Sequence, residues 1–222
     1  MQTAYITHPA CLEHNMGYDH PESPERLRAI EDQLIASGIL PLLQQHEAPR
    51  VTHQQLARVH TENYLHMIEA IAPQHGMISL DADTFMNPYT LEAAYRAAGA
   101  LVLATDLVMT DKVENAFCNI RPPGHHATRD QAMGFCFFNN VAVGVAHAMA
   151  QHALKQVAIA DFDVHHGNGT EDIFKDDPRV MLCSTFQHPF YPHCGADSSS
   201  DHIINVPLTA RSDGQAFRYA VM

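Results

Sequence analysis

The chain has 222 residues, of which 46% are hydrophobic, and its formal net charge is −12. This length predicts a single domain with a sizeable core, and the acidic balance argues against a nucleic-acid partner, because phosphate binding needs clustered Lys and Arg. Five cysteines without a CxxC pair, no signal-peptide pattern and no membrane-spanning apolar run predict a cytoplasmic protein with free thiols that does not bind membranes.

The first half of the chain is predicted to be mainly helical. Ser23, Pro24 and Gly38 are of the residue types that begin and end a helix, and Thr52 with Gln55 forms a capping-box pattern. In chain order, the predicted elements are a strand at 3–7, a helix at 23–38, a short helix after residue 52, and helices at 61–71 and 90–109.

In the second half, predicted strands alternate with helices. The strands are expected at 113–120, 157–160, 180–183 and 203–206, and the helices at 139–151 and 171–174. This alternation predicts an α/β fold with an open, mostly parallel sheet flanked by helices. Ligands bind beyond the carboxyl ends of the strands in such sheets, and two His-rich loops lie there.

The second of these loops, DFDVHHGNG (161–169), follows the apolar strand 157–160, which we expect to be buried. An extended chain turns Asp161, Asp163 and His165 to one side and directs Phe162 and Val164 into the core. Carboxylate and imidazole ligands favour zinc, or a similar first-row ion such as Fe²⁺. A loop that only turns the chain is the alternative, and the complete pattern after a buried strand favours the metal site.

The first His-rich loop contains a tandem pair, His125 and His126, directly after Pro-Pro-Gly. Two histidines can simply be exposed, but beside a metal site they can divide the roles of general base and general acid. Each imidazole then needs a partner that sets its tautomer, and Asp161 and Asn168 have the right chemistry.

Three segments carry a resemblance to a known family. RPPGHHA (121–127), MGFCFFNNVAV (133–143) and DFDVHHGNGTEDIF (161–174) resemble successive signatures of the histone deacetylase superfamily, in the form seen in class II and bacterial amidohydrolase members. HPESPERLRAI (20–30) and DADT (81–84) fit the same resemblance. It implies an arginase/deacetylase-like α/β fold formed by one deacetylase-like domain over 1–222.

The resemblance also implies roles for individual residues. His125 and His126 match the catalytic pair, with His126 the better candidate for general base and acid, and Asp161 and Asn168 match their partners. Asp163 and His165 match two of three zinc ligands. Further matches are the substrate tunnel, at Gly134, Phe135 and Tyr191; an arginine of a product channel, at Arg26; and a structural K⁺ site, at Asp161, Asp163, His165, Ser184 and Thr185.

The implied function is zinc-dependent removal of acetyl or other acyl groups from lysine side chains or polyamines. The family's third zinc ligand and its oxyanion-stabilising tyrosine lie in motifs that do not occur in these 222 residues, so we expect a domain that is incomplete at its C-terminus. Two alternatives stay open: an arginase-like ureohydrolase with two manganese ions, and an inactive metal-binding fragment of a longer deacetylase. A short form that completes itself by self-association is also consistent with the sequence.

Overall fold

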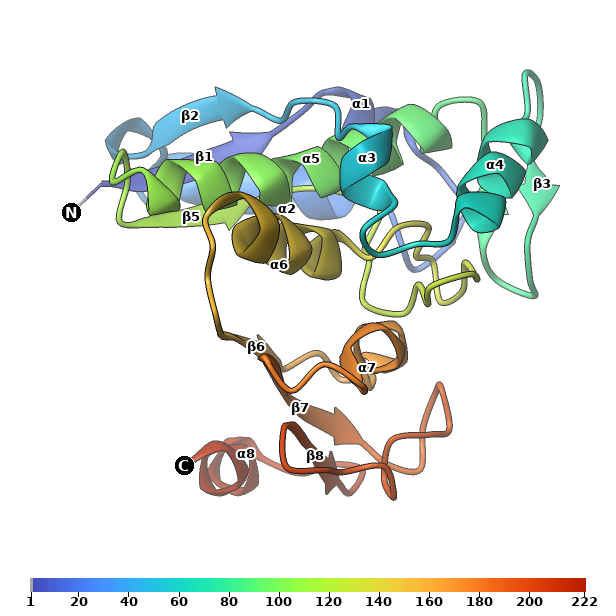
Figure 1. Cartoon of the computed structure of the whole chain (residues 1–222). Coiled ribbons are helices and arrows are strands. Elements are labelled where there is room, and N and C mark those ends of the chain that lie inside the picture. Colours follow the sequence, from blue (N-terminus) through green and yellow to red (C-terminus); the bar gives the residue numbers. More distant parts are fainter. Residues whose placement is uncertain (1) are drawn as a thin grey trace.

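The computed structural model describes residues 2–222 and contains two small parallel sheets (Figure 1). The first has the strand order β2-β1-β5, formed by Gln44–Glu47, Thr3–Thr7 and Asn115–Cys118. The long helix α5 (Thr90–Met109) packs along this sheet and against α6 (Asn140–Gln151). The alternating strands and helices therefore give the predicted α/β architecture.

The second sheet has the order β6-β7-β8, formed by Val157–Asp161, Val180–Gln187 and Ile203–Leu208. Helix α7 (Asn168–Phe174) packs on β7, and α8 (Gly214–Val221) contacts the same strand. The remaining elements are α1 (Ala10–Glu13), α2 (Glu25–Ala36), a 3-10 turn (Leu40–Leu42), α3 (His53–Leu56), α4 (Glu62–Ile71) and the antiparallel pair β3 (Ile78–Ser79) and β4 (Phe85–Met86).

Local sequence signals account for several helix boundaries. The side chain of Thr52 accepts a hydrogen bond from the Gln55 N–H and the Gln55 side chain accepts one from the Thr52 N–H, which is the predicted capping box of α3. Asn139 caps α6 through the Ala142 N–H. These caps fix where the chain leaves each preceding loop, including the loop with the histidine pair.

The strand β6 differs from the prediction of a fully buried strand. Ile159 is buried, but Ala158 and Ala160 are exposed, because within residues 2–222 β6 pairs with β7 alone and no strand lies on its other edge. The prediction that Phe162 and Val164 enter the core is also wrong. Both are exposed, with 76% of Phe162 accessible, because the chain bends after β6 and turns them toward an open surface beside β7 and α8.

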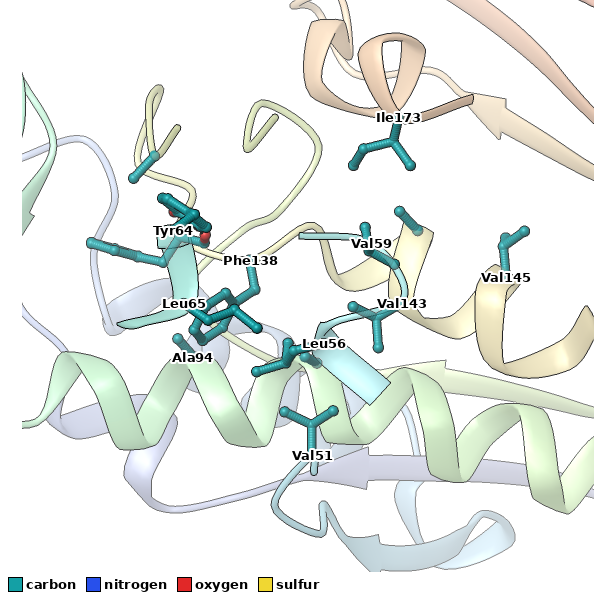
Figure 2. Packing of buried hydrophobic residues seen from close by; sticks show 14 of the residues in the cluster. Val51, Leu56, Val59, Tyr64, Leu65, Ala94, Phe138, Val143, Val145 and Ile173 are labelled. Carbon is teal, nitrogen blue, oxygen red and sulfur yellow. Dashed lines mark hydrogen bonds between the residues drawn. The ribbon is translucent and has the colours of Figure 1, made fainter. Parts of the chain in front are cut away.

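The larger of two apolar clusters in the described part of the chain joins the second sheet to the helices, while Ala4 and Ile6 of the first sheet belong to the smaller one. Figure 2 shows Ile173 of α7 directed toward Val59, which follows α3, and toward Val143 of α6. The same cluster includes Ile159, Val180 and Leu182 from the second sheet. Within residues 2–222, no helix is long and apolar enough to cross a bilayer.

Candidate active site

The loop with the histidine pair, 121–138, is held by buried polar residues at both ends. At its start, Arg121 is fully buried and donates to the Glu22 carboxylate and to the carbonyls of Cys11 and His14. At its end, the His60 ring accepts from the Asn139 N–H and donates to the Thr128 carbonyl. These contacts anchor both ends of the loop in the protein interior.

Each histidine of the pair has its own partner from the segment after β6. His125 Nδ1 donates to Asp161 Oδ2 at 2.9 Å, and His126 Nδ1 lies 2.8 Å from Asn168 Oδ1. Because the Asn168 Nδ2 donates to the sulfur of Met133, its Oδ1 is the atom that accepts from His126. Both imidazoles thus use Nδ1 as a donor, which leaves Nε2 of neutral His126 as an acceptor.

Asp163 and His165 lie beside this pair. The His126 and His165 ring centroids are 5.8 Å apart, and the Asp163 and His165 side chains contact one another at 3.1 Å. The site is compact because two glycines allow close approach. A Cβ on Gly167 would lie 2.2 Å from Asp161 Oδ2, and one on Gly169 would lie 2.2 Å from the Ala127 carbonyl oxygen.

A cavity of about 370 Å³ opens above these side chains. Both histidines of the pair, Asp163 and His165 line it, together with Gly134, Phe135, Tyr191 and Arg26. Gly134 has a φ of 55°, and a Cβ there would lie 2.4 Å from the His126 ring, so only glycine fits beside the histidine. The cavity therefore contains every residue that the sequence assigned to the tunnel.

The two histidines differ electrostatically. Burial on its own would lower the pKa of His125, but the hydrogen bond and charge of Asp161 outweigh it, and the pKa is raised. Burial and the neighbouring His125 lower the pKa of His126 to about 3, and the neutral Asn168 offsets this only in part. His125 is thus the better proton holder, and His126 is neutral at physiological pH.

The comparisons with known proteins agree with this geometry. The family model of the histone deacetylase domain matches residues 20–222. The chain belongs to the histone deacetylase family. Family membership confirms the predicted resemblance and fold class, and it favours an amidohydrolase over a manganese ureohydrolase.

Individual members of the histone deacetylase family show how much of a whole protein this chain represents. It is 38% identical to a histone deacetylase-like amidohydrolase of Pseudomonas aeruginosa, over 91% of this chain and 55% of that protein. It is 34% identical to the polyamine deacetylase HDAC10 of Rattus norvegicus, over 89% of this chain and 36% of that one. The crystal structure of the HDA15 HD domain matches with a TM-score of 0.88 and 36% identity, over 93% of this chain and 62% of that chain. The chain thus spans under two thirds of each of these proteins.

Asp163 and His165 offer a carboxylate and an imidazole to a metal ion at the cavity wall. Within residues 2–222 this pair has no third His, Cys, Asp or Glu atom close enough to complete a three-ligand group, and the groups that do meet that condition lie elsewhere. Two ligands fit a first-row ion chemically, but they hold it less firmly than three.

The residues matched to the family's monovalent-cation site lie where β6 and β7 pair. Asp161 is opposite Ser184 in the register, and Thr185 follows. The hydroxyl of Thr185 is buried without a hydrogen-bond partner, as expected of an oxygen that faces a cation, whereas the Ser184 hydroxyl contacts His166. This unpartnered oxygen fits K⁺.

Several residues in the cavity lining or next to it were not predicted from the sequence. Glu22 and Asp83 add carboxylates to the lining, and Phe190 stacks on the His165 ring at a centroid distance of 5.1 Å. Thr84 accepts a hydrogen bond from the Phe135 N–H and so positions the tunnel wall. For Asp83 and Thr84, the sequence signal was the DADT motif (81–84). This motif fits the family resemblance, but it did not assign a role to either residue.

Proposed function

We propose that this chain forms the active-site region of a zinc-dependent amidohydrolase that removes acetyl groups from lysine side chains or polyamines. The observation that carries the proposal is the pair of hydrogen-bonded units, His125–Asp161 and His126–Asn168, beside Asp163 and His165 in one cavity. Two imidazoles with different partners next to a metal-ligand pair suit hydrolysis that needs both a proton acceptor and a proton donor.

The cavity suits the proposed substrate class. Phe135 and Tyr191 supply flat walls for an extended aliphatic chain, and the Asp83 carboxylate at the lining favours a cationic substrate. One relative is named a histone deacetylase-like amidohydrolase and another a polyamine deacetylase. These names correspond to the two candidate amines, the lysine side chain and the polyamine. Acetyl-lysine and acetylpolyamine share the acyl-amide bond on which the site would act.

Asp163 and His165 would hold the zinc ion. When bound, zinc supplies a Lewis acid that polarises the amide carbonyl and acidifies water. Zn²⁺ and Fe²⁺ are both compatible with this carboxylate and imidazole pair. Asp161, Ser184 and Thr185 would bind K⁺ and so stabilise the same segment. The unpartnered Thr185 hydroxyl is consistent with this role.

The two histidines would move the protons. Neutral His126 presents an unprotonated Nε2 and would take a proton from the attacking water. His125, with its pKa raised by Asp161, would keep a proton and stabilise negative charge that develops on the carbonyl oxygen. A proton returned to the amine nitrogen lets the amine leave, and acetate is the second product.

Hydrolysis of a fluorogenic acetyl-lysine peptide by the 222-residue chain with added zinc tests this function. We expect turnover in the wild type and a loss of about 100-fold or more in His126→Ala, because general acid–base catalysis contributes that much. His75→Ala is the matched control, since His75 is exposed and lies outside the cavity lining.

Equal turnover in His126→Ala and wild type would contradict the assigned role. A folded wild-type chain that binds zinc and hydrolyses neither the acetyl-lysine peptide nor an acetylpolyamine would contradict the proposed activity. It would favour the alternative of an inactive metal-binding fragment.

A further inference from the structure

A second cluster of metal-ligating side chains lies between α5 and α6, and none of its residues lines the active-site cavity. Asp106 of α5 accepts hydrogen bonds from His147 of α6 and from His152, which caps the end of that helix. The two Nε2 atoms lie 2.8 and 2.7 Å from the same carboxylate oxygen, Oδ1. Two imidazoles and a carboxylate thus point to one spot.

The backbone holds all three side chains in place. Helices α5 and α6 pack closely along their lengths, so Asp106 and His147 face one another across a helix pair. The N–H of His152 bonds to the Ala148 carbonyl, which fixes its backbone at the end of α6, and its ring contacts Asp106. The candidate ligand atoms lie within 4.8 Å of one another, so small side-chain movements bring them to coordination distance.

We propose that Asp106, His147 and His152 form a zinc site that ties α5 to the end of α6. Two imidazoles and one carboxylate are ligands that Zn²⁺ favours. Because 43% of the Asp106 side chain is exposed, water can reach the fourth position, while His147 is almost fully buried and anchors the site. The inference is independent of the proposed catalytic function.

The charge state of the cluster suits a cation. Burial on its own would raise the pKa of Asp106, but the hydrogen bonds from His152 and His147 outweigh it, and the carboxyl is held ionised. Zinc would take the place of the two Nε2 protons that Asp106 now accepts, and each neutral imidazole would then carry its proton on Nδ1.

Arg58 is expected to oppose zinc binding, so its removal is a test of the proposal. Its guanidinium lies 3.3 Å from His147 Nδ1, the nitrogen that must carry the proton when Nε2 binds a metal. Arg58 therefore has to turn away before zinc is bound. Removing it should tighten binding by about 10-fold, the usual scale for a change beside a metal ligand.

Zinc titration of the full chain against a chromophoric chelator is the test, in a background of Asp163→Ala with His165→Ala that removes the active-site ligand pair. We expect this chain to retain about one zinc site, and Asp106→Asn to weaken it by more than about 100-fold. Asparagine keeps an oxygen that accepts both hydrogen bonds, so the fold is preserved while the charged ligand is lost. His66→Ala is the matched control, because His53, Glu62 and His66 form an exposed three-ligand group on α3 and α4.

The expected pattern is weaker binding in Asp106→Asn and His152→Ala, tighter binding in Arg58→Gln, and no change in His66→Ala. Zinc should also raise the melting temperature of the background chain but not that of its Asp106→Asn variant. A background chain that binds no zinc would overturn the proposal. Binding that survives Asp106→Asn, or that disappears in His66→Ala, would overturn it as well.

Discussion

The two loops that build the active site differ in how firmly the rest of the chain holds them. The loop 121–138 is fastened by buried Arg121 at its start and by His60 and Asn139 at its end. In the segment 162–167, the N–H groups of Asp163 and His165 bond to the carboxylates of Asp161 and Asp163, whereas buried His166 contacts Ser184 and Glu171 outside the segment.

The side chains of the two loops also differ in how exposed they are to solvent. The His125 side chain is 17% exposed, whereas those of Asp163 and His165 are 49% and 32% exposed. The proposed proton-transfer groups are therefore more enclosed than the proposed metal ligands, and we expect a bound ion to add order mainly to Asp163 and His165. The following predictions test this difference, from the largest expected effect to the smallest.

The contact between the two loops at Gly169 is expected to be the most sensitive. A Cβ in Gly169→Ala would lie 2.2 Å from the backbone oxygen of Ala127, so the loop or the start of α7 must shift. We expect a loss of about 3 kcal/mol in the free energy of unfolding, measured by urea denaturation, together with a loss of hydrolysis. Gly214→Ala is the control, because a Cβ there only approaches the flexible Arg218 side chain at 3.4 Å. Equal stability of the two variants would contradict the close packing of the loops.

Removing the charge that supports His125 should affect catalysis more than folding. Asp161→Asn keeps the shape but no longer raises the pKa of His125, so the imidazole loses its proton more readily. We expect kcat/KM to fall by about 100-fold while the melting temperature changes little. An unchanged kcat/KM would show that the charge of Asp161 does not assist the reaction.

Acid should loosen the fastened loop through His60. Burial lowers the pKa of His60 to about 4, and its Nε2 accepts the Asn139 N–H, so the folded state keeps this ring neutral. As the pH falls below the unfolded value of about 6.5, the unfolded state binds a proton that the folded state does not, and stability decreases until the pH reaches the folded value.

From pH 7 to pH 5, His60 should contribute a loss of about 2 kcal/mol in the free energy of unfolding. His60→Gln should be less stable at pH 7 and show a smaller decrease over this range, measured by denaturation at each pH. Parallel pH curves for the variant and the wild type would rule out His60 as a source of acid sensitivity.

The smallest expected effect concerns the partner of His126. Asn168→Asp places a carboxylate 2.8 Å from Nδ1 and should raise the pKa of His126. The acid limb of the hydrolysis pH profile should then move upward by about one pH unit, with less than about a 10-fold change in maximal rate. A profile that does not move would show that His126 does not control that limb.

The sequence predicted the elements that depend on local signals. The helix at 90–109 has the predicted bounds, and the capping box at Thr52 forms as expected, because both depend on neighbouring residues. The motif 161–169 was correctly placed at the end of a strand, next to the histidine pair. The single-domain and cytoplasmic assignments stay predictions.

What the sequence could not predict depends on residues far apart in the chain. The burial of Arg121 against Glu22 joins positions separated by 99 residues, and the Thr84 bond to Phe135 joins positions separated by 51. The exposure of Phe162 depends on the bend after β6 and on the open surface beside β7 and α8, and alternation within one segment specifies neither.

The most direct test of the account is the metal dependence of hydrolysis in the chain and in Asp163→Ala. The chain is treated with a chelator, dialysed, and assayed with an acetyl-lysine peptide as zinc is added back. We predict that zinc restores turnover in the wild type but not in Asp163→Ala, while both proteins keep the same circular dichroism spectrum, because the contacts that anchor the histidine loop do not include Asp163. Turnover that persists without metal, or that zinc restores equally in both proteins, would contradict the account.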